Sequence, residues 1–440
     1  MDQDFMKEKK VLPLVLTMSY PMAISMAVNA LYNIVDSFFV AQLDVKAMTA
    51  LSLLFPVQNL SHSAAVGFAI GINATVAFYL GQEKSEPADR AVSSGTLLSV
   101  IHGFILTAIC IAVMPWFLSM FTVDAAITNY GIEYSRYVFL FAPMDCMFLT
   151  CEKIFQSVGR MKTTMFCLAA GCITNIILDP LMIFGIGPFP QLGIRGAAIA
   201  TGIGQSLPVL IYIALYVLRP LPVRFRIQYC RPELYMIKRL YSIGNAATLN
   251  LALPSVQISV LNAILSSFSS GYVFVLGVYY KLQTFLYLSA NGVVQGIRPL
   301  VGYNYGAGRN DRVREIVKIA TITVACIMLA GTAVCLLIPA RLMGIFTDDE
   351  AIISIGVSAI RIISAGFIIS SLPVILSGAL EGLGKGTASL MISLIRYIIV
   401  ILPLAFLLSR VSGACGVWHA FWLTEIVAAA VSYLIYRVTV

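Results

Sequence analysis

Four carboxylic acids lie well inside apolar stretches of this 440-residue chain, and they are Asp36, Asp145, Asp179 and Glu425. An ionisable side chain within a lipid bilayer is costly, so each is a functional candidate by default. Asp36 follows Asn29 by seven residues and Asn33 by three, which places all three on one face of a helix. The first acid therefore comes with side-chain amides beside it.

Asp179 has a similar polar neighbour. Asn175 precedes it by four residues and shares its helical face, and Pro180 frees a backbone carbonyl in the preceding turn. Two carboxylates, side-chain amides and a free carbonyl suit either a proton relay or a cation held by oxygen atoms. The alternative is structural, with each acid bridged to a membrane-embedded cation such as Arg136 or Lys281.

The composition shows what kind of protein must position these groups. Hydrophobic residues make up 59% of the chain and charged residues 11%, with a mean hydropathy of +0.89. Soluble domains are about 45–50% apolar and about 25% charged. These values exclude an ordinary soluble enzyme, a disordered chain and a secreted disulfide scaffold, and they indicate an all-α polytopic membrane protein.

Twelve apolar segments are long enough to span a bilayer, which takes about 20 residues. We expect them at residues 11–40, 48–80, 91–120, 131–158, 163–185, 196–218, 236–267, 272–304, 314–340, 351–380, 387–409 and 414–437. With this topology 20 Lys and Arg residues fall on the side of the termini and 4 on the other. The bias predicts that both termini lie in the cytoplasm, and we expect the protein in the plasma (bacterial inner) membrane. Anionic lipid, and no nucleic acid, then accounts for the net charge of +8.

The chain also repeats itself at an offset of 225 residues. Gly67, Gly71, Gly81, Arg136 and Gly159 recur as Gly292, Gly296, Gly306, Arg361 and Gly384. Each half carries six expected helices, so the halves share one orientation, as in transporters that rock around a central site. The predicted organisation is a lobe at 1–218, a basic cytoplasmic linker at 219–235 and a second lobe at 236–440.

The sequence contains no recognisable motif for a metal site or for an enzyme. The three histidines, His62, His102 and His419, are isolated in the sequence, and the nine cysteines form no CxxC pair. The metalloprotease motif HExxH and the hydrolase motif GxSxG are absent from the sequence. We therefore expect no metal site, no organic cofactor and no enzymatic activity.

Several segments together resemble the multidrug and toxic compound extrusion (MATE) family, especially its bacterial MepA-like branch. They are LYNIVDSFFVAQL, VGFAIGINATVAFYLG, NIILDPLMIFGIG with GIRGAAIAT, and VVQGIRPLVGYNYGAG, in this order on a 6+6 repeat. The resemblance implies two six-helix bundles forming a V around a central cavity. It also implies a monomeric secondary transporter that expels cationic, often aromatic, drugs in exchange for H+ or Na+, of which we favour H+.

The resemblance also implies roles for particular residues. The family's ion-coupling cluster matches Asp36, Asn175, Asp179 and Thr201 in this chain, and Asn29 falls where the family has a polar cavity residue. We add Asn33 and Asp145 as tentative residues of the substrate cavity. The seventh and tenth spans offer Gln257 and Ser370–Ser371 where some branches carry acids, which argues against ion coupling in the C-terminal lobe.

A flippase for a lipid-linked saccharide or a peptidoglycan precursor is the alternative. Such a protein would need a cationic cavity for pyrophosphate, and Lys281, Arg298, Arg361 and Arg396 all fall in the C-terminal half. The role of Glu425 stays open at this stage.

Overall fold

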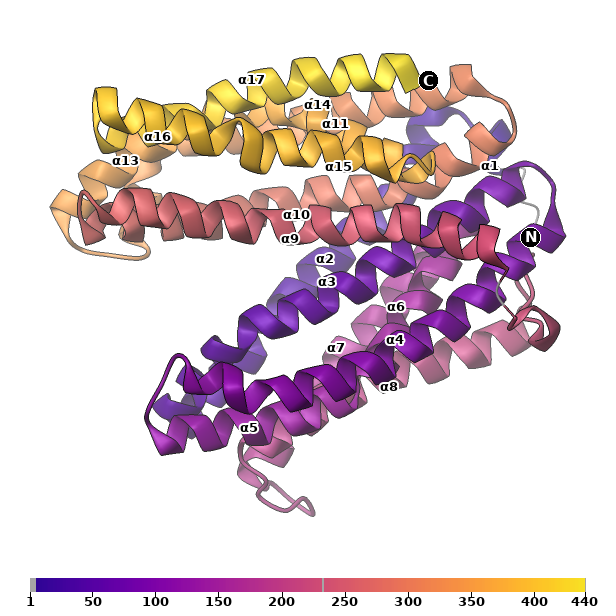
Figure 1. Cartoon of the computed structure of the whole chain (residues 1–440), viewed down its shortest axis with the longest axis horizontal. Coiled ribbons are helices and arrows are strands. Elements are labelled where there is room, and N and C mark those ends of the chain that lie inside the picture. The colour runs from indigo at the N-terminus through magenta and orange to yellow at the C-terminus, as the bar shows by residue number, and fades with distance from the viewer. Residues whose placement is uncertain (1–4, 232, 440) are drawn as a thin grey trace. The chain divides into compact units, whose positions relative to one another are not determined.

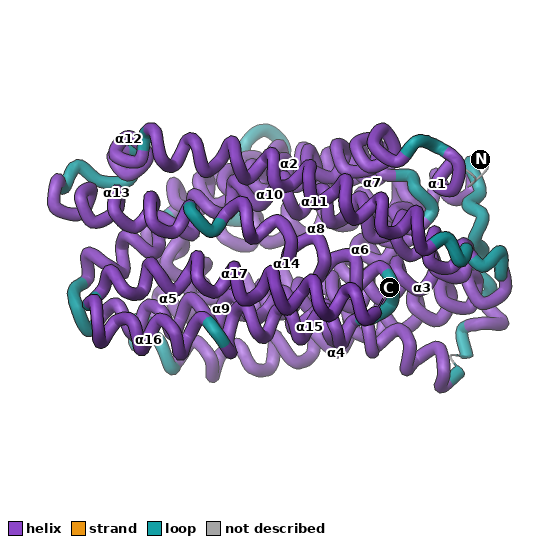
Figure 2. Tube along the Cα trace, turned by 90° about the horizontal axis from the view of Figure 1, so that it is seen from above, coloured by secondary structure: helices purple, strands orange, loops and turns teal. Residues whose placement is uncertain are grey.

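A computed structural model describes residues 5–231 and 233–439, so Pro232 of the expected linker lies outside the described residues. Within these two ranges every regular element is a helix and there is no strand, which confirms the all-α prediction (Figure 2). The first half contains α1 (Phe5–Glu8), α2 (Val11–Leu43), α3 (Val45–Gly81), α4 (Ser85–Ser119), α5 (Ala125–Leu140), α6 (Ala142–Ser157), α7 (Met161–Phe184), α8 (Ile194–Leu218) and the short η1 (Ile227–Tyr229). The second half contains α9 (Leu234–Ser266), α10 (Ser270–Gly306), α11 (Asn310–Leu337), α12 (Pro339–Gly344), α13 (Glu350–Ser364), α14 (Phe367–Gly382), α15 (Gly386–Leu394), η2 (Ile395–Ile399), α16 (Ile401–Ser412) and α17 (Ala414–Thr439).

Ten helical segments in the described part of the chain are long and apolar enough to cross a membrane, and the pair α13 and α14, bent by 54°, makes up to eleven. The remaining expected span, 131–158, is covered by α5 and α6, which are 16 residues each. Each helix is shorter than the about 20 residues that span a bilayer, and together they carry five charged side chains. The count of twelve therefore rests on the repeat as well as on hydropathy.

The chain divides into two compact units, and the division falls inside two helices (Figure 1). The N-terminal unit is Ile24–Thr248, and the C-terminal unit comprises the chain up to Ala23 together with Leu249 onward. Thus α2 and α9 each belong to one unit in their first part and to the other in the rest. The compact units are defined by contacts and the predicted lobes by the repeat, so the division at residues 219–235 stays a prediction.

Glycines of α3 fix the first part of α9 within the N-terminal unit. A Cβ added at Gly67 would lie 2.5 Å from the backbone nitrogen of Thr248, and one added at Gly71 would lie 2.5 Å from the carbonyl oxygen of Leu240. Residues without a side chain let two helices approach to backbone contact. This contact holds the first part of α9 against α3.

The repeat-related glycines do the same work in the C-terminal unit. A Cβ added at Gly292 of α10 would lie 2.5 Å from the Cα of Ala23, and one at Gly296 would lie 2.7 Å from the Cα of Ser19. The first part of α2 is therefore held against α10 as the first part of α9 is held against α3. The glycines that repeat in the sequence therefore make equivalent helix–helix contacts in the two units.

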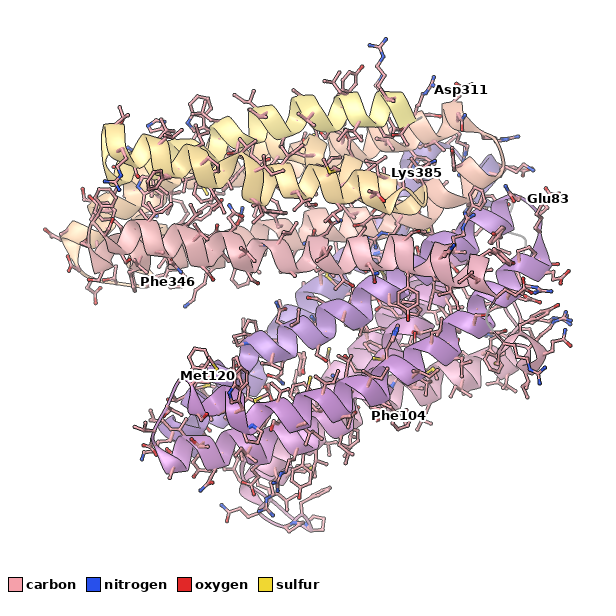
Figure 3. The ribbon with its side chains drawn as sticks, viewed as in Figure 1. Glu83, Phe104, Met120, Asp311, Phe346 and Lys385 are labelled. Atoms are coloured by element: carbon pink, nitrogen blue, oxygen red, sulfur yellow. The ribbon has the colours of Figure 1, made fainter. Side chains whose placement is uncertain are left out.

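Both described ends of the chain lie at the same end of the C-terminal unit. Asn304, near the end of α10, donates a hydrogen bond to the backbone carbonyl of Met6, with 3.1 Å between nitrogen and oxygen. The side chain of Tyr436, near the end of α17, interacts with Arg314 at the start of α11. Figure 3 shows Asp311 and Lys385 at this end of the unit and Phe346 at the opposite end. The two described ends of the chain thus lie on one side of this unit, as an even number of spans requires.

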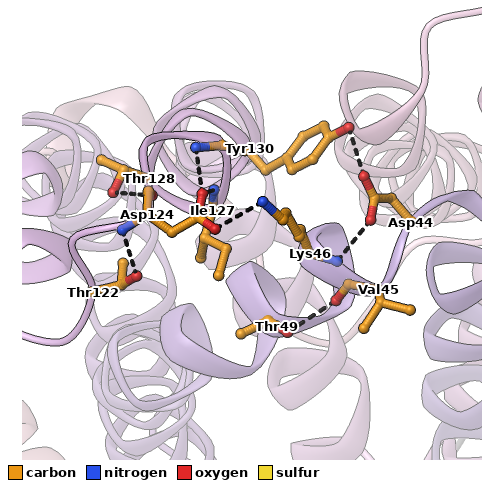
Figure 4. A network of polar contacts seen from close by, with 10 residues as sticks. Asp44, Val45, Lys46, Thr49, Thr122, Asp124, Ile127, Thr128 and Tyr130 are labelled. Atoms are coloured by element: carbon orange, nitrogen blue, oxygen red, sulfur yellow. Dashed lines mark hydrogen bonds and ion pairs between the residues drawn. The ribbon is translucent and has the colours of Figure 1, made fainter.

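Helix starts also repeat between the halves. Asp124 caps α5 by accepting hydrogen bonds from the amides of Ala126 and Ile127, and Asp349 caps α13 in the same way. Figure 4 shows that Asp124 also pairs with Lys46 of α3, with 2.8 Å between Nζ and Oδ2. The repeat position of Lys46 is a glycine, so this ion pair belongs to the first half alone.

Candidate functional site: a carboxylate cluster in the N-terminal unit

The four residues assigned to ion coupling come together inside the N-terminal unit. Asp36 lies on α2, Asn175 and Asp179 on α7, and Thr201 on α8. The amide nitrogen of Asn175 donates to Asp179 Oδ1 at 3.3 Å and to Thr201 Oγ1 at 3.4 Å. The carboxyl groups of Asp36 and Asp179 interact with each other. Side chains from positions as far apart in the sequence as 36 and 201 thus lie in one cluster.

The cluster is buried and rich in unpaired acceptors. Asp179 is 0% exposed, Asn175 2% and Thr201 7%. Asp36 Oδ1, Asn175 Oδ1 and Asp179 Oδ2 are buried oxygen atoms that accept no hydrogen bond from an N–H or hydroxyl group of the described residues, and the two carboxyl groups face each other. Buried polar atoms in proteins nearly always have a partner, so three orphaned oxygens in one cluster call for an explanation.

Close packing of α7 on α8 positions Asn175. A Cβ added at Gly204 of α8 would lie 3.0 Å from the Cβ of Asn175, and one added at Gly171 of α7 would lie 2.4 Å from the carbonyl oxygen of Gly204. The two glycines let the helices touch at their backbones, which brings Asn175 within reach of Thr201. Pro180 lies inside α7 directly after Asp179, where it removes one backbone donor.

Ion pairing with lysine or arginine does not account for these acids. Within residues 5–231 and 233–439, neither Asp36 nor Asp179 forms a salt bridge. In these two ranges no group of three or more His, Cys, Asp and Glu side chains is arranged so that it could hold a metal ion. Any cation held here would be bound by the two carboxylates together with neutral oxygens.

Sequence reasoning missed two tyrosines of this cluster. Tyr134 of α5 is 3% exposed, and its hydroxyl group forms side-chain hydrogen bonds with Gln58 and Thr201. Tyr134 and Tyr32 both interact electrostatically with Asp36 and Asp179. Tyr32 precedes Asp36 by one helical turn and was therefore detectable, whereas Tyr134 becomes a neighbour only through the packing of α5.

The three tentative cavity residues lie outside the cluster. Asn33 is exposed, and its amide nitrogen donates to the backbone carbonyl of Asn29 at 2.7 Å. Asp145 of α6 instead contacts His62 of α3, with 3.4 Å between Oδ2 and Nδ1. Their assignment to a substrate cavity stays a prediction.

The fourth intramembrane acid, Glu425 of α17, has a cationic partner. Arg396 donates to it through Nε at 2.8 Å and through a terminal guanidinium nitrogen at 2.7 Å. Arg396 lies within η2, a π-helical turn in the middle of its span, and such turns are frequent at functional sites. Glu425 thus forms the kind of bridge that the sequence left open as the structural alternative.

A comparison with known families decides the identity of the fold. The MatE family model matches residues 21–181 and again residues 247–407. The chain belongs to the MatE family. The two matches have equal lengths, and their starts are separated by almost the same offset as the glycine repeat. The family assignment and the many apolar helices make this a multi-pass membrane protein.

Relatives of this MatE chain match nearly its whole length. The multidrug export protein MepA of Staphylococcus aureus (strain NCTC 8325 / PS 47) is 25% identical over 439 residues, covering 98% of this chain and 94% of that protein. The MepA protein of Staphylococcus haemolyticus is 23% identical over 432 residues, with the same coverage of 98% and 94%.

Solved structures share the fold. A multidrug resistance MATE family transporter of the MOP superfamily in an outward-facing conformation superposes with a TM-score of 0.92, at 22% identity and over 100% of this chain and 98% of that one. A MOP superfamily transporter from Pyrococcus furiosus gives the same TM-score of 0.92, identity of 22% and coverage of 100% and 98%. The predicted MATE-like architecture is confirmed.

Proposed function

We propose that this membrane protein exports organic, mostly cationic and aromatic, compounds in exchange for a small cation bound at Asp36, Asn175, Asp179 and Thr201. The observation that carries the proposal is the set of three buried oxygens without a donor, on Asp36, Asn175 and Asp179. A bound proton or Na+ would satisfy such acceptors. The relatives named multidrug export proteins support the choice of cargo.

The chemistry of the cluster favours H+ as the exchanged ion, with Na+ as the second candidate. Two interacting carboxylates can share one proton, because two adjacent negative charges in a buried site repel each other. Na+ would use the carboxylate, amide and hydroxyl oxygens together. In either case binding one positive charge reduces the repulsion between Asp36 of α2 and Asp179 of α7.

Movement of α2 is the expected consequence of ion binding. Pro21 lies inside α2, where proline weakens the helical hydrogen-bond ladder, and α2 passes from one compact unit to the other between Ala23 and Ile24. Protonation of Asp36 or Asp179 would rearrange this helix near Pro21 and displace the exported compound. Proton and cargo thus bias a two-state equilibrium in opposite directions.

The flippase alternative loses part of its support. It needs free cationic side chains in the C-terminal half, but Arg298 pairs with Glu381 at 2.7 Å and Arg396 pairs with Glu425 at 2.7 Å. Two of its four candidate cations are therefore neutralised by carboxylates. A pyrophosphate would have to displace both acids to be bound there.

We further propose that both termini face the cytoplasm and that the protein acts as a monomer in the plasma membrane. The excess of Lys and Arg on the side of the termini supports this orientation. Anionic lipid headgroups are the partners that this basic side would meet.

The test is efflux of a fluorescent lipophilic cation from proteoliposomes under an imposed pH gradient or an imposed Na+ gradient. We compare wild type, Asp36→Asn and Asp179→Asn with Asp348→Asn, which alters an exposed acid outside the cluster. Efflux driven by one gradient and lost in the first two variants alone would establish exchange and identify the ion. Full gradient-driven efflux by folded Asp36→Asn would rule out this coupling site.

A further inference from the structure

A second acidic group in the N-terminal unit lies outside the coupling cluster. Asp145 of α6 contacts His62 of α3 across 3.4 Å, and the histidine side chain is 52% exposed against 16% for the aspartate. The imidazole is therefore the more accessible of the two groups, and the carboxylate the more buried. This pair bridges the second and fourth spanning segments of the first half.

The repeat provides an internal comparison for this bridge. The equivalents of His62 and Asp145 in the second half are Tyr287 of α10 and Ser370 of α14. Tyr287 donates a hydrogen bond to the hydroxyl group of Ser370 at 2.7 Å. The same two places are bridged in both halves, but a titratable acid–base pair in one half is replaced by two neutral hydroxyl groups in the other.

The charges around the two bridges differ as well. In the C-terminal unit Arg396 donates to Tyr287 at 3.0 Å and is itself neutralised by Glu425. In the N-terminal unit the titratable groups that act most strongly on the charge of His62 are Asp145, Glu152 and Lys153, all on α6. Glu152 and Lys153 pair with each other at 3.3 Å. Among the described residues, Asp145 forms its ion pair with His62, and this pair exists only while the imidazole is protonated.

We propose that Asp145 anchors the positive charge of the exported organic cation, and that protonated His62 competes with that cation for the same carboxylate. The proposal rests on the proposed function and adds the substrate-binding group to it. With neutral His62 the carboxylate accepts the cation. With charged His62 the carboxylate already has its counter-ion, so an acidic compartment favours release.

Direct binding measures this site separately from transport. The probe is tetraphenylphosphonium, a permanent cation, so every pH effect belongs to the protein. Its dissociation constant is measured on purified, monodisperse protein in nanodiscs between pH 5.5 and 8, the range in which an imidazole ordinarily titrates. The wild-type protein should bind more tightly as the pH rises through this range.

Four variants isolate the two side chains. Asp145→Asn should weaken binding about tenfold or more at pH 8, where the wild-type carboxylate is free for the probe. His62→Gln should remove the part of the pH dependence that the histidine supplies and leave binding tight at low pH. His62→Lys should weaken binding at every pH, because its charge is permanent in this range. Ser370→Ala, at the repeat-equivalent position, should bind as the wild type does.

Two results would overturn the proposal. One is that Asp145→Asn binds the probe with wild-type affinity. The other is that His62→Gln keeps the wild-type pH dependence of binding, a result that tests the proposal even if Asp145→Asn does not fold. If either result accompanies intact gradient-driven efflux, the proposed function stands and the anchoring role falls. If wild-type protein neither binds nor exports the cation, both fall together.

Discussion

Arg298 of α10 and Glu381 of α14 form a buried ion pair, with 2.7 Å between the guanidinium nitrogen and the carboxylate oxygen. Both side chains are 7% exposed, and Asn250 of α9 donates a further hydrogen bond to the same carboxylate at 2.8 Å. The pair thus ties three helices of the C-terminal unit together. The repeat-equivalent residues, Asn73 and Gln156, are neutral, so this ionic bridge is particular to the second half.

Removing one member of this pair should lower the stability of the fold. Glu381→Leu leaves Arg298 buried without a counter-ion, which costs about 3–5 kcal/mol in comparable pairs. The double variant Arg298→Met with Glu381→Leu should recover much of this loss, because no charge is left buried. Thermal unfolding of the purified protein in detergent measures both effects. Equal midpoints for Glu381→Leu and wild type would show that the pair does not stabilise the fold.

Helix packing can be tested with two glycines of α10. Gly292→Ala would place a methyl group 2.5 Å from the backbone of Ala23, which forces α2 to shift and should destabilise by about 1–3 kcal/mol. Gly277→Ala on the same helix meets no atom within 4 Å, so it should be neutral or stabilise by up to about 1 kcal/mol. The comparison again uses unfolding midpoints. Similar midpoints for the two variants would contradict the close approach of α2.

Asp124 predicts an acid-sensitive contribution to stability at the start of α5. The hydrogen bond from Lys46 is the main cause that lowers the pKa of the Asp124 carboxyl below its ordinary value of 3.8. Since the unfolded chain then binds its proton more readily, the carboxylate stabilises the native state at neutral pH. This contribution is lost as the pH falls below about 3.8, through the lower native pKa.

The measurement is the decrease in the thermal unfolding midpoint of Asp124→Asn relative to wild type, at pH 7 and at pH 3. This decrease should be smaller at pH 3. Asp349→Asn is the matched control, because Asp349 caps its helix in the same way but has Gly271 at the repeat position of Lys46. Its loss at pH 7 should be the smaller of the two. Equal losses for the two variants at pH 7 would show that Lys46 adds nothing.

Tyr134→Phe removes the hydroxyl group that contacts Gln58 and Thr201 beside the two carboxylates. We expect gradient-driven efflux to fall several-fold without being abolished, since the carboxylates themselves remain. Tyr137→Phe, on the same helix, should transport as the wild type does. Unchanged efflux in Tyr134→Phe would place the tyrosine in a purely structural role.

Much of the coupling site was predictable because its residues can be recognised from the sequence around them. Asn175 and Asp179 are four residues apart on one helix, and carboxylates are rare enough in apolar spans to stand out. Tyr134 and Gln58 gave no such signal, since tyrosine and glutamine near span ends are common. Glu381 escaped notice for a related reason, because it falls one residue beyond the expected span 351–380.

The sequence by itself determined the membrane class, the all-helical fold and the two-fold repeat, because hydropathy and glycine spacing are local properties of the chain. Only the tertiary structure decided which charges meet. Among the described residues it left Asp36 and Asp179 without a Lys or Arg partner, paired Glu425 with Arg396, and brought His62 to Asp145. It also divided α2 and α9 between two compact units. These outcomes depend on how helices distant in sequence pack, and the energy of a buried charge depends on that packing more than on its neighbours in the chain.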